Sequence, residues 1–309
     1  MISLQIETTS RCTLKCPACS RTEFNKVTNK PYPNYDIDPD ILYNFLNCNL
    51  GKEIDTLFLC GDYGDSIYYP KLFYFLEKFK PTKNIILVTN GSHRNEKFWN
   101  ELCSRLDCND TIVFSVDGWD HESNIKYRIN SDWDSIMLGI DIVAKHNIKL
   151  EWETNIFSFN YNYLDKIKQL AESKGAAFIC KKTGRFGENF LRPPEDNLID
   201  INEIYNSSYS LPDPNLVIVP QCEGRRRNSI MAQHYFVPCG WISSPRSLYK
   251  SQVWKNKDAW SIIGKTLDDL QENTLTPWVE SIKNNMSTCE TICKMKCKEG
   301  QLERIIYDM

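Results

Sequence analysis

Six short apolar runs alternate with longer amphipathic segments along residues 1–183. Runs of this length and composition predict strands, which we place at residues 4–7, 56–60, 84–89, 111–116, 149–157 and 176–181. The segments between them predict helices, because apolar residues recur along one face of several of them, as Leu72, Phe75, Leu76 and Phe79 do. We place these helices at residues 39–48, 71–79, 96–106, 133–146 and 161–174.

Strands that alternate with helical crossovers form a parallel sheet with right-handed connections. Six such units are too few to close an eight-stranded barrel. The expected fold is therefore α/β, a partial (β/α)6 TIM-like barrel. In barrels of this kind the functional residues lie at the carboxyl ends of the strands. A site is expected in the loops that follow the strands.

The composition of the sequence changes after residue 183. Residues 184–215 are rich in Pro, Asn, Asp and Ser, which is typical of a linker. Short runs at residues 216–219 and 229–237 then predict a hairpin, and residues 267–285 predict a helix. We therefore divide the chain into a partial barrel at residues 1–183, a linker at residues 184–215 and a small hairpin-plus-helix domain at residues 216–309.

Charge and hydropathy narrow the range of partners. The chain has 37 Lys and Arg against 40 Asp and Glu, a net charge of −3, which argues against binding duplex nucleic acid or anionic lipid through the whole surface. No run approaches 18 apolar residues, so no transmembrane helix is expected. The first residues lack the basic and apolar regions of a signal peptide. A cytoplasmic protein with no membrane partner is expected.

Thirteen cysteines are present, and three of them lie close together after the first predicted strand. Cys12, Cys16 and Cys19 have the spacing C-x3-C-x2-C. Three thiolates on one loop can hold one face of an iron–sulfur cluster, which takes four ligands when fully coordinated. Zinc is the alternative, but it requires four ligands, and no further Cys or His follows within 25 residues. The spacing favours a cluster with one iron open to another molecule.

In this triplet and its place after the first strand, the sequence resembles the radical S-adenosylmethionine (SAM) superfamily. The resemblance implies a partial barrel in which Cys12, Cys16 and Cys19 hold a [4Fe–4S] cluster. It also implies that the amino and carboxylate groups of SAM chelate the fourth iron. The family usually has a bulky residue just before the third cysteine, where this chain has Ala18.

The resemblance extends to polar residues at the ends of the later strands. After the second strand, Gly64-Asp65 stands where the family has a Gly-Glu pair that binds the SAM amino group. Glycine permits close approach of the backbone, and a carboxylate suits an ammonium group. The other SAM-contacting residues implied by the resemblance are Asn90, Ser115, Asp117, Arg128 and Asn155. Each alone is an ordinary loop or turn residue, but their joint order along the chain favours a SAM site.

Five further cysteines lie beyond the predicted barrel, namely Cys222, Cys239, Cys289, Cys293 and Cys297. Their arrangement resembles the twitch or SPASM extension of radical SAM enzymes. There, cysteines on both sides of a hairpin join two from a helical tail to bind an auxiliary [4Fe–4S] cluster. Five ligands are too few for two clusters, so one is expected, and the spacing leaves open which two tail cysteines bind it. Zinc held by the same ligands is the alternative.

The resemblance implies an enzyme that cleaves SAM reductively to a 5′-deoxyadenosyl radical and removes a hydrogen atom from its substrate. This is a tailoring reaction of oxidoreductase or isomerase type. The expected partners are an external electron donor of flavodoxin or ferredoxin type and a small-molecule, nucleotide or peptide substrate. The Gly-Asp-Tyr-Gly-Asp motif, together with Val-Pro-Cys, resembles radical SAM proteins of phages and environmental bacteria. The alternative is a non-catalytic zinc-binding interaction protein.

Overall fold

A single mixed sheet with strand order β6-β5-β4-β3-β2-β1-β7-β8 organises the chain. The computed structural model describes residues 2–181, 183, 192, 222, 228–240, 242, 248–249 and 251–283. The six predicted strands are present and pair in parallel. They are β1 (Ser3–Ile6), β2 (Thr56–Leu59), β3 (Asn84–Thr89), β4 (Thr111–Ser115), β5 (Lys149–Asn155) and β6 (Ala177–Lys181). The expected α/β fold with a parallel sheet is confirmed.

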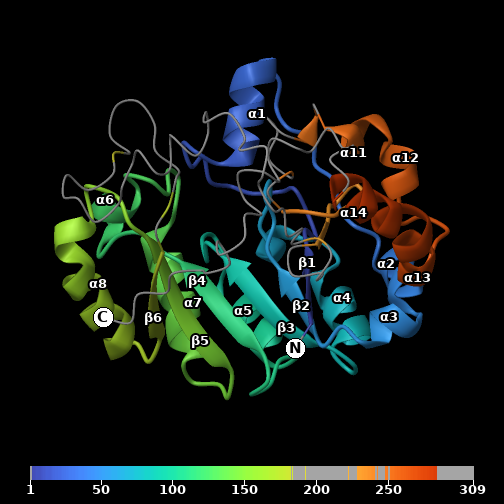
Figure 1. Ribbon diagram of the computed structural model, residues 1–309. Coiled ribbons are helices and arrows are strands. Elements are labelled where there is room, and N and C mark those ends of the chain that lie inside the picture. Colours follow the sequence, from blue (N-terminus) through green and yellow to red (C-terminus); the bar gives the residue numbers. More distant parts are fainter. Residues whose placement is uncertain are drawn as a thin grey trace.

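Helices fill the connections between these strands (Figure 1). They are α1 (Ser20–Thr28), α2 (Pro39–Leu46), α3 (Asn49–Lys52), η1 (Ser66–Tyr68), α4 (Leu72–Phe79), α5 (Glu96–Cys103), α6 (His121–Asn124), α7 (Trp133–Val143), η2 (Tyr161–Tyr163) and α8 (Leu164–Ser173). In α4, Leu72, Phe75, Leu76 and Phe79 are buried. This is the apolar face that the 3.6-residue period predicts. Helix α1, which we did not predict, stands above the sheet in Figure 1.

A short hairpin extends the parallel sheet beyond β1. Its strand β7 (Ser229–Ile230) pairs in parallel with β1 and antiparallel with β8 (Phe236–Val237). Residues 229–237, predicted as one strand, are therefore a complete hairpin, because the chain reverses through His234 at a left-handed φ of 66°. The partner strand predicted at residues 216–219 lies outside the described residues. Pairing with β1 ties the hairpin to the strand that leads into the cysteine triplet.

The helix predicted at residues 267–285 is present as three consecutive segments. They are α13 (Leu267–Leu270), the π-helical η3 (Gln271–Leu275) and α14 (Thr276–Lys283), preceded by α11 (Gln252–Lys255) and α12 (Lys257–Trp260). The Asp268 carboxylate accepts hydrogen bonds from the backbone N–H groups of Asn49 and Leu50, at 3.1 and 2.9 Å. This contact anchors α13 to α3. In the described part of the chain, no helix has the length and apolar character needed to cross a bilayer.

The hairpin turn is expected to weaken in acid. His234 Nε2 accepts a hydrogen bond from the Asp38 N–H at 2.8 Å, so this nitrogen must be unprotonated. Burial lowers the pKa of His234, Asp38 acts to raise it and Lys71 to lower it. A histidine with a lowered folded pKa stabilises the fold above its unfolded pKa of about 6.5 and loses that contribution as pH falls.

The test is chemical unfolding of the wild type and of His234→Gln at pH 7 and pH 5. Between pH 7 and pH 5 the free energy of unfolding of the wild type should fall by about 1 kcal/mol more than that of the variant. The reason is that the glutamine side-chain carbonyl accepts the same N–H group without titrating. An equal loss in both proteins would show that His234 is not the acid-sensitive contact.

Candidate functional site

The cysteine triplet lies on a loop that leaves the carboxyl end of β1. Glu7, Thr8, Thr9 and Ser10 continue the strand as buried polar residues, and Cys19 is the N-cap of α1. Arg21, in the first turn of α1, donates through one guanidinium nitrogen to the carbonyl oxygens of Ser10 at 3.2 Å and Cys12 at 2.8 Å. Through Arg21, the first turn of α1 therefore holds the start of the cysteine loop in place.

The three thiols share one environment. Cys16 is buried with Leu14, Tyr127 and Phe157, and the partly buried Cys12 and Cys19 pack against the same group. Burial, the charge of Asp65 and the neighbouring Cys16 and Cys19 all raise the pKa of the Cys12 thiol, against one backbone hydrogen bond that lowers it. The three thiols therefore lie around one shared apolar cluster, and their role as cluster ligands stays a prediction.

The donor set of this loop fits an iron–sulfur cluster. Thiolates are the ligands that such clusters take, one to each iron, and the loop presents three of them. A single metal ion instead needs its ligands converging within bonding distance of one point. Among the residues that the structure describes, no three His, Cys, Asp or Glu side chains converge in this way.

Gly64 and Asp65 join the exit of β2 to the exits of β1 and β3. A Cβ on Gly64 would lie 2.0 Å from the Thr9 carbonyl oxygen, so only glycine fits there. One oxygen of the buried Asp65 carboxylate accepts from the Asn90 N–H at 2.7 Å and the Thr89 hydroxyl at 3.1 Å. The other oxygen accepts from the Ile67 N–H at 3.1 Å. In this structure Asp65 fastens two strand ends together, and its contact with SAM stays a prediction.

Asn90 lies between this carboxylate and the cysteine loop. Its side-chain N–H group donates to Asp65 and lies 3.7 Å from the Cys12 sulfur. Its carbonyl oxygen accepts from the Ser92 N–H at 3.0 Å. The amide is thereby fixed with its donor end facing Cys12. The predicted site residues of β1, β2 and β3 meet here.

A second group, which follows β4 and β5, contains three of the predicted residues. The fully buried Asp117 accepts from Arg128 Nε at 2.6 Å with one oxygen and from the Asn155 N–H at 2.7 Å with the other. Burial acts to lower the pKa of Arg128, but Asp117 and then Cys16 raise it, so the guanidinium stays charged beside the Cys16 thiol. Ser115 is buried at the end of β4. Burial raises the pKa of Asp65, and the positive charge of Arg128 acts to lower it. The two groups are therefore close enough to interact electrostatically.

The cysteines predicted to hold an auxiliary cluster are only partly described. Cys222 and Cys239 are both buried and belong to the main hydrophobic core. Cys289, Cys293 and Cys297 lie outside the described residues. The ligand set of the auxiliary cluster therefore remains a prediction.

Sequence reasoning missed a buried carboxylate directly after β1. Glu7 accepts hydrogen bonds from the backbone N–H groups of Tyr63 at 2.7 Å and Ala232 at 3.5 Å. Burial and the neighbouring Asp62 raise the pKa of Glu7 to about 8, against three backbone hydrogen bonds that lower it. The available signal was the run of four polar residues, Glu7 to Ser10, immediately after an apolar strand.

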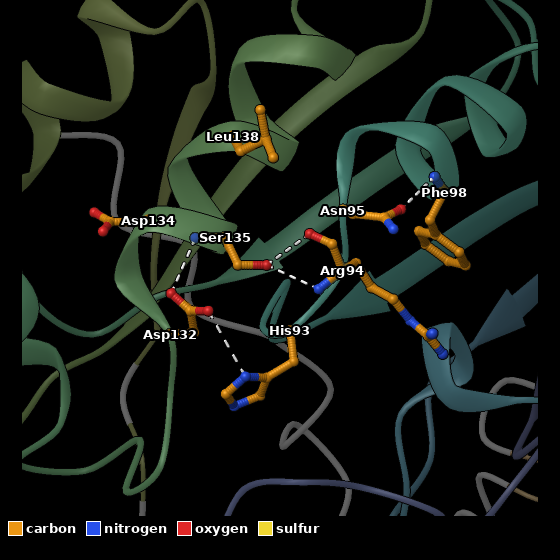
Figure 2. Close-up of a pocket in the computed structure, with 8 residues that line it drawn as sticks. All are labelled: His93, Arg94, Asn95, Phe98, Asp132, Asp134, Ser135 and Leu138. Carbon is orange, nitrogen blue, oxygen red and sulfur yellow. Dashed lines mark hydrogen bonds and ion pairs between the residues drawn. The ribbon is translucent and has the colours of Figure 1, made fainter.

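A pocket of about 450 Å³ lies beside the site, between the starts of α5 and α7. Figure 2 shows His93 facing Asp132 across it, with Ser135 bonded to the backbone of Arg94. None of the predicted site residues lines this pocket. His93 Nε2 lies 2.9 Å from the Asn130 carbonyl oxygen, and the Asn130 amide donates to the Thr13 carbonyl oxygen at 2.8 Å. The pocket is therefore linked to the cysteine loop at Thr13, through His93 and Asn130.

Comparison with known proteins finds likeness in structure only. No protein-family model matches the sequence, and no relative is found among the curated proteins. Streptococcus suis SuiB bound to S-adenosylmethionine superposes with a TM-score of 0.62 at 13% identity, over 95% of this chain and 72% of SuiB. The anSMEcpe enzyme with bound AdoMet and Kp18Cys peptide superposes with a TM-score of 0.56 at 16% identity, over 94% of this chain and 88% of that one.

SuiB bound to its precursor peptide SuiA also matches, with a TM-score of 0.54 at 13% identity, over 82% of this chain and 64% of SuiB. SuiB and anSMEcpe are radical SAM enzymes. Identities this low establish the architecture rather than the chemistry. The expectation of a radical SAM barrel, made from the cysteine triplet and the strand pattern, is confirmed at the level of the fold. The chain has the fold of the radical SAM enzymes.

Proposed function

We propose that this chain is a radical SAM enzyme, with a [4Fe–4S] cluster on Cys12, Cys16 and Cys19. The observation that carries the proposal is the meeting of three thiols with the Asp65–Asn90 and Asp117–Arg128 groups at the carboxyl ends of the strands. Structures of the same fold hold AdoMet. A thiolate triplet beside buried, oppositely charged groups suits a cluster together with a zwitterionic ligand.

The bound cluster and SAM would supply an electron and a C5′–S bond, whose cleavage gives methionine and a 5′-deoxyadenosyl radical. The chain supplies the surroundings. Within the described residues, Asp117 engages only Nε of Arg128, so the terminal nitrogens of the guanidinium can donate to the SAM carboxylate. Tyr127 and Phe157 bury Cys16 and exclude water from that side of the site.

We extend the proposal to an auxiliary [4Fe–4S] cluster held by Cys222, Cys239 and two of Cys289, Cys293 and Cys297. Support comes from the burial of the first two in the same hydrophobic core as Ile230 and Phe236 of the hairpin that pairs with β1. An external donor of flavodoxin or ferredoxin type would supply the electron.

A peptide is the substrate class that we propose to test first. SuiB has been solved with its precursor peptide SuiA, and anSMEcpe with the Cp18Cys and Kp18Cys peptides. The reaction would begin with removal of a hydrogen atom from a carbon of that peptide. The hydrogen then appears in 5′-deoxyadenosine, which makes the substrate traceable.

Anaerobic reconstitution with iron and sulfide, followed by SAM and dithionite, tests the function. Two clusters predict about eight iron and eight sulfide atoms per chain, together with formation of 5′-deoxyadenosine. Deuterium transfer from a labelled peptide pool into 5′-deoxyadenosine would identify the substrate class. A colourless protein that takes up zinc and leaves SAM intact would instead establish the zinc-binding interaction protein.

A further inference from the structure

The hydroxyl of Tyr68 connects the cysteine loop to the exit of β3. Tyr68 is the last residue of η1, and its hydroxyl donates to the Ser92 carbonyl oxygen at 2.8 Å. The same oxygen lies 2.8 Å from the Thr13 hydroxyl and 3.3 Å from the carbonyl oxygen of the Asn90 amide. The single phenolic proton is shared between the Ser92 carbonyl oxygen and, over the longer distance, the Asn90 side-chain oxygen, so the Thr13 hydroxyl is the donor in its bond to Tyr68.

Two of these partners lie next to Cys12. Thr13 follows Cys12 in the chain, so a bond to its hydroxyl restrains the backbone that carries the thiol. Asn90 faces the thiol directly, with its side-chain nitrogen 3.7 Å from the Cys12 sulfur. Tyr68 therefore contacts both the loop that carries Cys12 and the amide that donates toward its sulfur.

The ring of Tyr68 is itself held in place. The Arg94 guanidinium lies 5.1 Å from the Tyr68 ring centroid and 4.6 Å from that of Phe98, a geometry favourable for cation–π attraction. Arg94 also donates to the Ile67 carbonyl oxygen, and Figure 2 shows it beside Phe98 at the pocket wall. Burial raises the pKa of Tyr68, so the hydroxyl keeps its proton across the working pH range.

We propose that Tyr68 is a positioning residue for Cys12, acting through Thr13 and Asn90. Its hydroxyl fixes the direction from which the Asn90 N–H group meets the sulfur. The placement of the thiol is a property of the protein alone. Its consequence for a cluster rests on the function proposed above, because hydrogen bonds to the ligand sulfurs help to set the reduction potential of an iron–sulfur cluster.

The first experiment needs no cluster. Metal-free protein is alkylated under anaerobic, reducing conditions, and the modification of Cys12 is followed by peptide mass spectrometry relative to the exposed Cys108. Tyr68→Phe and Thr13→Val should each raise the relative rate at Cys12 about two- to tenfold, the range of one lost hydrogen bond. The matched control is Tyr74→Phe, which removes an exposed hydroxyl bonded to Asp40 and should leave the rate unchanged.

The second experiment measures the reduction potential of the reconstituted cluster by spectroscopic titration. Tyr68→Phe should make it more negative than in the wild type and in Tyr74→Phe, because a less well placed N–H group stabilises the reduced cluster less. Wild-type alkylation at Cys12 in both Tyr68→Phe and Thr13→Val would overturn the assignment. If Tyr68→Phe fails to fold, Thr13→Val decides. Wild-type protein that cannot cleave SAM would contradict the proposed enzyme function. The alkylation comparison would still test whether Tyr68 positions Cys12.

Discussion

Replacing Cys16 with alanine is expected to abolish reductive cleavage of SAM. Cys16 is the most buried of the three thiols and lies beside the Arg128 guanidinium, so its loss would remove one of the three ligands that we propose for the cluster. With an auxiliary cluster intact, the variant should keep about half of the wild-type iron. The measurements are iron content after reconstitution and 5′-deoxyadenosine formed with dithionite.

The control is Cys108→Ala, which removes an exposed thiol from the loop between α5 and β4. It should leave both the iron content and the cleavage rate unchanged. Cleavage at the wild-type rate in Cys16→Ala would show that the ligands have been assigned wrongly. Loss of all the iron would instead show that the auxiliary site depends on the first cluster.

Much of the barrel could be predicted from the sequence, because each buried strand is a short apolar run between amphipathic helices. Helix α1 could not. It contains no buried residue, so its sequence lacks the apolar period that reveals other helices, and its N-cap is Cys19, the last cysteine of the triplet. The hairpin at residues 229–237 was also missed, because the reversal occurs at His234 rather than at a glycine.

In the site, too, the positions of the residues could be predicted from the sequence, but their hydrogen-bond partners could not. The sequence places Asn90, Asp117 and Asn155 at strand ends and Asp65 in the loop after the second strand, and the structure finds them there. The sequence does not reveal which N–H and O–H groups donate to each carboxylate, because those donors depend on the register between strands. Asp65 therefore holds Asn90 in the structure, although the motif alone suggested an acceptor for a ligand. Tyr68 carried no signal, because its role arises only where η1 passes the cysteine loop.

The Asp117–Arg128 pair should be the most sensitive ionic contact of the site. Its side chains are 0% and 11% exposed, and Asp117→Asn would leave the buried guanidinium without its counter-charge. Breaking a buried pair by removing one partner costs about 3–5 kcal/mol. The new amide would also turn an N–H group toward donors on Arg128 or Asn155. We expect a loss of this size in the free energy of unfolding, measured by denaturant titration.

Asp141→Asn is the matched control, because the same substitution there breaks the Lys174–Asp141 pair, whose side chains are 28% and 45% exposed. An exposed pair contributes about 0–1 kcal/mol, so this variant should unfold close to the wild type. Equal losses in the two variants would mean that water reaches Arg128 and compensates its charge. A guanidinium solvated in that way would bind a ligand carboxylate only weakly. The stability comparison therefore also tests the proposed role of Arg128 in binding the SAM carboxylate.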